Sequence, residues 1–387
     1  MELMRLILTA GLLSAPAAVL AQALIDPGQT SVITQYFDVE KNEKPLRCEV
    51  NPIPPRLNFS FRFQTGYVLR VPMSQYFGPG HRWSILTRVQ PESGGESSYL
   101  GAEFRLPTVP KTKRKVEWGG FYWVGEGHYS VDFLLYDESN RVCRKHWSME
   151  AKLDDNERGI TPGMPPGKVA EVSFRRWSPQ DNADVHSLHK LTVLLHAAPL
   201  SPRTARFHVQ DRLMLLGSLA SLLESLPARS VRLVIFNLDQ QKELFRDDHF
   251  TPEEFSRASQ SMNGLELQLV NYDILKNGRG HVDLLAHLVN HELKAREPSD
   301  AVIFLGPATR YFDKVPTDSL EEQAAGGPRF FYFQYKPYYR RPRPAAEFSD
   351  SIESAVKRVH GRKFVIHTAG EFAKAIRQVD VRILAEK

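Results

Sequence analysis

The chain has 387 residues, of which 42% are hydrophobic and 25% are charged, and its formal net charge is +5. This composition is that of a globular protein and excludes an intrinsically disordered chain. The small positive charge is spread along the chain and does not by itself indicate binding to nucleic acid. The length favours two domains over one.

The N-terminus has the layout of a secretory signal peptide. Arg5 precedes the apolar run 6–13, and small residues follow it, which fits cleavage after Ala21 or Ala23. The apolar run is too short to cross a bilayer. No later segment has 18 consecutive apolar residues. We therefore assign residues 1–23 to the signal peptide and expect the mature protein in the periplasm or outside the cell, with no transmembrane segment.

The sequence contains two cysteines, Cys48 and Cys143. In an exported protein, an even number of cysteines is compatible with a disulfide bond. The sequence does not give the distance between them, so one disulfide and two separate buried thiols both stay open. A bond that closes so long a loop would add a few kcal/mol of stability at most.

Residues 24–155 contain short segments rich in β-branched and aromatic residues, separated by turn residues. This spacing predicts an antiparallel β-sandwich. The clearest pair of strands lies in 127–153, around a turn at 137–140. This hairpin resembles the terminal hairpin of immunoglobulin-like (Ig-like) bacterial modules, which implies a domain that binds, spaces or packs. The other predicted strands are 57–63, 67–73, 81–89, 99–107 and 116–124.

Residues 156–170 are rich in proline and glycine, and we interpret them as an interdomain linker. Over 171–387, strand and helix patterns alternate, which predicts an α/β domain with a doubly wound, mostly parallel sheet. The predicted strands are 191–197, 231–238, 265–273, 300–307, 329–336 and 363–368, with a short antiparallel partner at 241–246. The predicted helices are 209–226, 250–262, 281–296, 351–359 and 371–379.

Three stretches of this half carry a resemblance to a known fold. They are LTVLLHAAPLSP (191–202), the helix and apolar strand over 281–307, and the C-terminal pattern SIESAVKRVHGRKFVIHTAGEFAKAIRQV (351–379). In their order and spacing they resemble the von Willebrand factor A-like (VWA) fold. The resemblance covers about half of the chain, from about 185 to 385.

The VWA family holds Mg²⁺ with a D-x-S-x-S loop, a Thr before the middle helix and an Asp after the central strand. The resemblance assigns the loop positions to His196, Ala198 and Leu200, the Thr to the neighbourhood of His281 and the Asp to that of Pro307. Mg²⁺ requires oxygen ligands, and these side chains offer none. We therefore expect a VWA-like domain with a degenerate metal site, and neither metal nor cofactor.

The histidines His281, His287 and His291 raise a second metal hypothesis. His287 and His291 are four residues apart, as in helical transition-metal sites. However, the stretch lacks the glutamate of an H-E-x-x-H motif, and His287 and His291 lie opposite the apolar stripe, which favours a solvated helix face. Nucleophile elbows and phosphate-binding glycine loops are also absent from the sequence, so no catalytic residue is assigned.

The segment YKPYYRRPRP (335–344) follows a predicted strand at the carboxyl edge of the sheet, where open α/β sheets bind ligands. Its tyrosines and arginines suit an anionic or glycan partner. A proline-stiffened connection is the alternative, and it is the more common role of such a loop. The hypothetical binding residues are Tyr338, Tyr339, Arg340, Arg341, Arg343 and, in the first loop, His196.

These patterns predict an exported, non-enzymatic binding protein. Its contacts would come from loops 196–204, 306–318 and 336–346, and its partner would be a protein or an anionic envelope polymer rather than nucleic acid. Two alternatives stay open. One is a secreted or periplasmic hydrolase with an unrecognised site, and the other is a purely structural module of an envelope complex.

Overall fold

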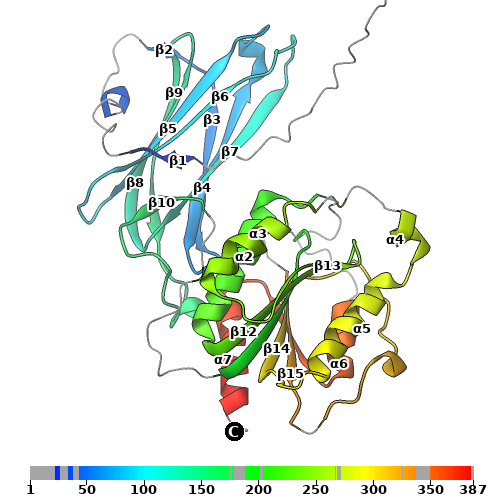
Figure 1. The fold of residues 1–387 in the computed structure, drawn as a ribbon. Helices are drawn as coiled ribbons and strands as arrows, with labels where there is room; N and C mark the ends of the chain where they lie inside the picture. The colour runs from blue at the N-terminus through cyan, green and yellow to red at the C-terminus, as the bar shows by residue number, and fades with distance from the viewer. Residues whose placement is uncertain are drawn as a thin grey trace, which may run out of the picture.

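The computed structural model describes residues 22–26, 34–37, 43–173, 177, 188–200, 204, 206–265, 267, 272–324, 326–336 and 349–384. These residues form three sheets, two in the N-terminal half and one in the C-terminal half (Figure 1). None of the described helices is long and apolar enough to span a membrane. The predicted signal peptide lies outside the described residues except for positions 22 and 23.

The two N-terminal sheets have the strand orders β1-β6-β5-β8-β9-β2 and β10-β7-β4-β3. Their pairings are antiparallel, apart from the two-residue parallel contact of β2 with β9. Side chains from both sheets, including Tyr67, Trp83 and Phe133, share one buried cluster, so the sheets pack face to face. The strands are β1 (Ala23–Leu24), β2 (Lys44–Pro45), β3 (Glu49–Leu57), β4 (Phe63–Pro72), β5 (Arg82–Pro91), β6 (Ser98–Arg105), β7 (Lys115–Val124), β8 (Gly127–Asp137), β9 (Arg141–Ala151) and β10 (Val169–Glu171).

The strand predicted at 57–63 is wrong, because residues 58–62 form the turn between β3, which ends at Leu57, and β4, which begins at Phe63. The Asn58 side-chain oxygen accepts hydrogen bonds from the main-chain N–H of Ser60 at 2.9 Å and of Arg62 at 3.3 Å, which closes the turn. The sequence analysis also missed β3, which contains three prolines. Prolines are tolerated there because β3 is an edge strand of its sheet.

The C-terminal sheet has the order β13-β12-β11-β14-β15-β16. Its strands are parallel except for the edge strand β13, which runs antiparallel to β12. Numbered along the chain, the order is 3-2-1-4-5-6, that of a doubly wound sheet. The strands are β11 (Leu188–His196), β12 (Ala228–Asn237), β13 (Lys242–Asp247), β14 (Ala301–Pro307), β15 (Arg329–Tyr335) and β16 (Arg362–Ile366).

Helices cover both faces of this sheet, which explains why its central strands are largely buried and mostly apolar (Figure 1). Helices α2 and α7 pack on one face, and α5 and α6 pack on the other. The helices of this half are α2 (Val209–Ser225), α3 (Phe255–Ser261), α4 (Tyr272–Lys276), α5 (Gly280–Leu293), α6 (Ser351–Arg358) and α7 (Ala369–Leu384), and the short 3₁₀ helices are η4 (Pro252–Glu254) and η5 (Thr317–Ser319).

Most predicted elements of this half fall on observed ones, with ends that differ by a few residues. The exception is the strand predicted at 265–273. Residues 266 and 268–271 lie outside the described part of the chain, and Tyr272 begins α4 instead of ending a strand. The last helix, α7, is also longer than the predicted 371–379, because its apolar positions continue to Ile383.

The segment 156–170, predicted as a linker, is packed rather than free. Its Ile160 side chain is buried, and the Gly163 N–H donates to the Phe61 carbonyl at 2.7 Å. At its end, β10 pairs with β7 and so belongs to the N-terminal sheets. The predicted linker is therefore wrong in position, and the chain reaches β11 through 172–187, most of which lies outside the described residues.

One buried cluster runs from the N-terminal sheets into the C-terminal half. The turn after β3 provides the contact. The Phe59 ring lies 4.7 Å from the Tyr335 ring and 5.6 Å from the Phe372 ring, and the Phe61 ring lies 5.7 Å from that of Phe372. The 3₁₀ helix η3 (Asp155–Glu157) also contacts α7. The two halves therefore share a core across their boundary.

A disulfide joins Cys48 and Cys143, whose Cα atoms are 6.1 Å apart. Cys48 directly precedes β3, and Cys143 lies on β9 in the facing sheet. The bond thus ties the two N-terminal sheets together and closes a loop of 95 residues.

Replacement of both cysteines (Cys48→Ser with Cys143→Ser) should lower the free energy of unfolding by about 2–4 kcal/mol, because the open chain regains loop entropy in the unfolded state. Urea unfolding followed by tryptophan fluorescence measures this change. The wild-type protein under reducing conditions is the matched comparison and should behave like the variant. An unchanged midpoint in both would contradict the structural role of the bond.

Candidate functional site

The carboxyl edge of the C-terminal sheet is the candidate site. Chain order reverses between β11 and β14, which are neighbours in the sheet. Open α/β sheets bind ligands where such a reversal occurs, outside the carboxyl ends of the strands. His196 ends β11 and Pro307 ends β14, so these two residues form the corner where the VWA resemblance would require metal ligands.

The His196 side chain fills this corner. It is 2% exposed, its ring lies 5.2 Å from the Phe236 ring, and its Nδ1 lies 3.2 Å from the Pro307 carbonyl oxygen. Since that oxygen can only accept, Nδ1 carries the proton. Gly306, with φ of 146°, allows this approach, because a Cβ there would lie 2.8 Å from the His196 carbonyl oxygen.

Burial lowers the pKa of His196, and the Pro307 carbonyl with the charges of Asp239 and Asp350 only partly opposes this effect. The ring is therefore neutral at neutral pH. A neutral, buried imidazole with its proton committed to a carbonyl is a packing group. The sequence hypothesis that His196 contacts a partner is wrong for this reason.

Asp350 is a buried acidic residue near this corner, and its hydrogen bonds hold elements of the fold together. It caps α6 by accepting the Glu353 N–H at 2.8 Å. Its other oxygen accepts the Gln334 amide at 2.8 Å and the Tyr332 hydroxyl at 3.0 Å. Burial, with the charge of Asp350 as the next cause, raises the pKa of Tyr332 well above its ordinary value. These bonds fasten the end of β15 to the start of α6.

The loop after β14 is held by two further contacts. The buried His281 ring stacks on Tyr311 with centroids 4.1 Å apart, and its Nε2 lies 2.9 Å from an Asp313 carboxylate oxygen. The Arg310 Nε lies 2.7 Å from Asp239. Burial is the largest single effect and lowers the pKa of Arg310, but Asp239 and Tyr311 together outweigh it, so the pKa is raised.

Between these fixed residues, the edge exposes apolar side chains. Phe312 in the loop after β14 is 58% exposed, and Tyr272 on α4, which precedes α5, is 75% exposed. Val209, at the start of α2, is 47% exposed. All three lie on segments that enter or leave the carboxyl edge. Aromatic side chains such as Phe312 and Tyr272 are of the types enriched at protein–protein interfaces.

The structure does not describe the predicted site residues of the segment after β15. Tyr338, Tyr339, Arg340, Arg341 and Arg343 lie outside the described residues. Their segment follows β15, which ends at the carboxyl edge as predicted.

The three histidines of α5 do not form one cluster of side chains. His281 is buried at its first turn, while the rings of His287 and His291 lie 6.5 Å apart. Within the part of the chain that the structure describes, no group of three or more His, Cys, Asp or Glu side chains is arranged to hold a metal ion.

The sequence analysis missed Asp350, Phe312 and the ion pair of Arg310 with Asp239. Asp350 had a detectable signal, since an aspartate followed three residues later by glutamate at the start of an apolar helix is typical of an N-terminal cap. Phe312 and the ion pair had none, because exposure and pairing across 71 positions depend on the fold.

Comparisons with known proteins do not identify a family. No protein-family model matches the chain, and no curated protein is similar to it. Among solved structures, the putative ApaA protein from Bordetella pertussis is 10% identical, over 29% of this chain and 99% of its own, with a TM-score of 0.21.

Two further structures are similarly remote. A lipoprotein from Bacteroides thetaiotaomicron is 15% identical over 32% of this chain and 92% of its own, with a TM-score of 0.17. A glycosyl hydrolase family 2 member from Bacteroides cellulosilyticus is 10% identical over 82% of this chain but only 37% of its own, with a TM-score of 0.21. Scores this low support no conclusion on fold or activity.

The pH dependence of the unfolding free energy tests whether His196 is held neutral. The folded-state pKa of His196 lies below the ordinary 6.5, so the unfolded chain takes up this proton first as the pH falls. The stability that neutral His196 contributes is complete above pH 6.5 and is lost below it, by at most about 1.4 kcal/mol per pH unit.

His196→Gln keeps an N–H donor but does not titrate. Between pH 7.5 and 5, the wild type should lose unfolding free energy faster than the variant, while groups common to both proteins cancel. Urea unfolding at stepped pH measures the difference. Parallel curves for the two proteins would mean that His196 is not held neutral.

Proposed function

We propose that the chain is an exported, non-enzymatic binding protein that contacts a protein partner through the carboxyl edge of a VWA-like half. The doubly wound order, mostly parallel strands and helices on both faces agree with what the VWA resemblance implies. The N-terminal sheets agree with an Ig-like sandwich that carries this half. Binding at the edge would proceed without a divalent cation.

The occupied corner is the observation that carries this proposal. The His196 ring takes up the space that a cation with its oxygen ligands would need, and the Pro307 carbonyl is already bonded to it. A partner must then be recognised by protein side chains. The exposed Phe312 and the Arg310 beside it are of the types that contribute most energy at protein–protein interfaces.

The sequence of the following loop supports a partner with an acidic surface. Residues 337–348 supply Arg340, Arg341 and Arg343 against a single acidic residue, Glu347. An anionic envelope polymer would satisfy the arginines alone, whereas a protein would also cover the aromatic side chains. The exposed apolar residues of the edge therefore favour a protein.

Export is part of the same proposal, and the first described residues support one cleavage position. Gln22 is buried and its amide donates to Thr87 Oγ1 at 3.0 Å, while Ala23 pairs with Gly101 in β6. Cleavage after Ala23 would remove both contacts, so we propose cleavage after Ala21. The disulfide suits an oxidising compartment outside the cytosol.

The mature protein recovered after export should therefore begin at Gln22. Intact mass and N-terminal sequencing of the secreted or periplasmic product measure this directly. A mature chain that begins at Leu24 would contradict the structural role of Gln22, and a product that retains residues 1–21 would contradict export by this route.

A pull-down from envelope extract tests the binding surface. A specific protein partner should be retained in the presence of EDTA, because no cation takes part. Phe312→Ala should reduce the recovered partner at least about tenfold, as expected for an interface residue worth more than ~1.4 kcal/mol. Replacement of Arg340, Arg341 and Arg343 by Ala should reduce it further.

The matched control is Phe77→Ala, since Phe77 is 74% exposed in the loop before β5 of the N-terminal half and far from the edge in sequence and topology. It should leave recovery unchanged. Release of the partner by EDTA, or equal effects of the Phe312 and Phe77 variants, would contradict the proposal. Turnover of ester, phosphate or glycoside substrates that depends on residues of this edge would instead favour the hydrolase alternative.

A further inference from the structure

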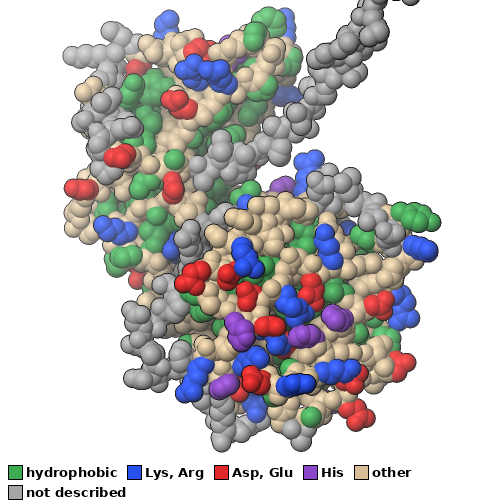
Figure 2. All heavy atoms as spheres, in the orientation of Figure 1, with side chains coloured by type: hydrophobic (Ala, Val, Ile, Leu, Met, Phe, Trp, Pro, Cys, Tyr) green, Lys and Arg blue, Asp and Glu red, His purple; other side chains and the backbone are tan. Residues whose placement is uncertain are grey.

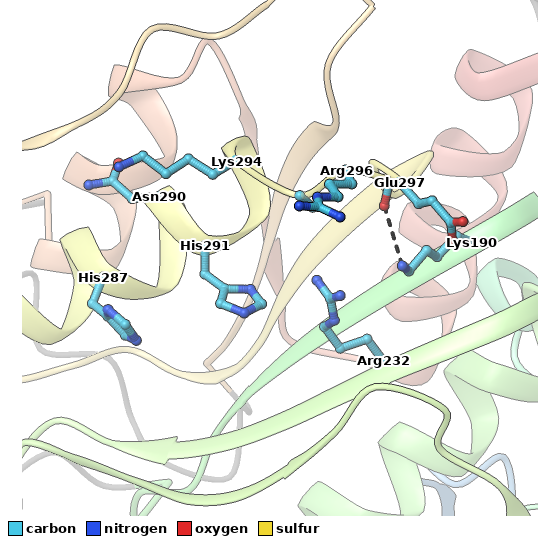
Figure 3. A pocket seen from close by; sticks show the side chains of 9 residues that line it. Lys190, Arg232, His287, Asn290, His291, Lys294, Arg296 and Glu297 are labelled. Atoms are coloured by element: carbon cyan, nitrogen blue, oxygen red, sulfur yellow. Dashed lines mark hydrogen bonds between the residues drawn. The ribbon is translucent and has the colours of Figure 1, made fainter.

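A second hollow lies at the opposite end of the sheet, beyond the last turn of α5 (Figure 3). It has a volume of about 720 Å³. This end carries the amino ends of the parallel strands, so none of its residues belongs to the carboxyl edge. The lining residues are Lys190, Arg232, His287, Asn290, His291, Lys294, Ala295, Arg296 and Glu297.

Two of the lining cations are buried. Lys190 on β11 and Arg232 on β12 are each 7% exposed. The buried Glu292 of α5 pairs with Arg232 at 2.8 Å, and the half-exposed Asp248 contacts the same guanidinium at 2.7 Å. The second Glu292 oxygen accepts the Thr192 hydroxyl at 2.9 Å. Both of these carboxylates are thus committed to Arg232 and its surroundings, and the exposed Glu297 is a further acidic residue that lines the hollow.

Lys190 has no such partner. Its ammonium donates to the Glu297 main-chain carbonyl at 3.3 Å, and within the described ranges no carboxylate forms an ion pair with it. A buried ammonium without a counter-charge is costly, and the cost is removed when an anion binds beside it. Here the hollow next to the ammonium provides the room.

Further hydrogen-bond donors lie near the Lys190 ammonium at the rim of the hollow. Figure 3 shows the ends of Lys190, Arg232 and Arg296 turned toward the same space, with the His291 ring beside it. Arg296 forms no ion pair with any residue that the structure describes. On the face drawn in Figure 2, Lys, Arg and His side chains over this half of the molecule are interspersed with Asp and Glu side chains.

The donor set identifies the ligand chemistry. Lysine supplies a compact charge, and arginine supplies a planar fork that matches phosphate oxygens. A carboxylate has two oxygens to share among the converging donors, whereas a phosphoryl group has three. The volume lies within the range of small-molecule pockets and leaves space for an organic body the size of a sugar.

We propose that this hollow binds a phosphorylated small molecule, with its phosphoryl group held by Lys190 and Arg296, while Arg232 stays paired with Glu292 and Asp248. The site is independent of the carboxyl edge and goes beyond the binding function proposed above. It requires no chemistry on the ligand, and it acts as a recognition site at the other end of the same sheet.

Calorimetry and thermal unfolding of the full mature chain test this site, with four probes: inorganic phosphate, glucose 6-phosphate, glucose and acetate. Both phosphates should bind and raise the melting temperature, since a ligand of the folded state stabilises it. Glucose 6-phosphate should bind more tightly than inorganic phosphate. Glucose and acetate should have no effect at the same concentrations.

Lys190→Met should weaken binding of both phosphates at least about tenfold. The variant should fold, because it replaces an uncompensated buried charge with an apolar side chain of similar length. Arg296→Gln, at an exposed position, should weaken binding as well and provides a second test. The matched control is Lys374→Gln, which removes an exposed cation from the basic groove of about 490 Å³ on α7 and should leave binding unchanged.

Absence of phosphate binding by the wild type would overturn the proposal, and so would an equal loss in the Lys190 and Lys374 variants. Competition by acetate would assign the hollow to carboxylates instead. A fifth probe, polyphosphate, separates sources of the phosphoryl group. Binding of polyphosphate alone, without either small phosphate, would mean a polymer site and would also overturn the proposal. None of these results depends on Phe312 or on the arginines of residues 337–348, so they are independent of the function proposed for the carboxyl edge.

Discussion

The contact of Phe59 and Phe61 with Phe372 and Tyr335 determines how the rest of the molecule is arranged. Aromatic rings remove a large apolar area from water, so a few of them suffice to join two elements. Here the rings sit on a tight turn closed by Asn58, which leaves them little freedom before they pack. The N-terminal sheets and the C-terminal sheet are consequently parts of one continuous core.

In the proposed function, the carboxyl edge would bind a partner without the cation that the VWA resemblance implies. In a cation site, much of the recognition energy comes from charge on a metal held by oxygen ligands. Here a neutral imidazole packs between Phe236 and the Pro307 carbonyl, and Asp350 holds the neighbouring strand end. Packed and hydrogen-bonded side chains lie beneath this edge, and exposed apolar side chains lie at its rim. Under the proposed function, such a surface would discriminate between partners by shape and side-chain contact instead of by charge on an ion.

Much of the fold could be predicted from the sequence, because apolar runs such as 191–197 and 300–307 report burial on both faces directly. The errors arose where alternation had another cause. Phe59 and Phe61 alternate with polar residues as in a strand, but they do so to reach the C-terminal half. That His196, Ala198 and Leu200 carry no side-chain oxygen is evident from the sequence itself. The burial of His196 and the isolation of Lys190 could not, since both depend on residues more than 100 positions away.

The shared core has a consequence for how this protein can be divided. A cut in the stretch 172–187 would leave the rings of Phe59 and Phe61 uncovered on one fragment and those of Phe372 and Tyr335 uncovered on the other. Each fragment would then expose an aromatic patch to solvent, which promotes aggregation. We therefore expect that the C-terminal half does not fold as an independent domain. The shared core also opposes a hinge motion of this half relative to the N-terminal sheets.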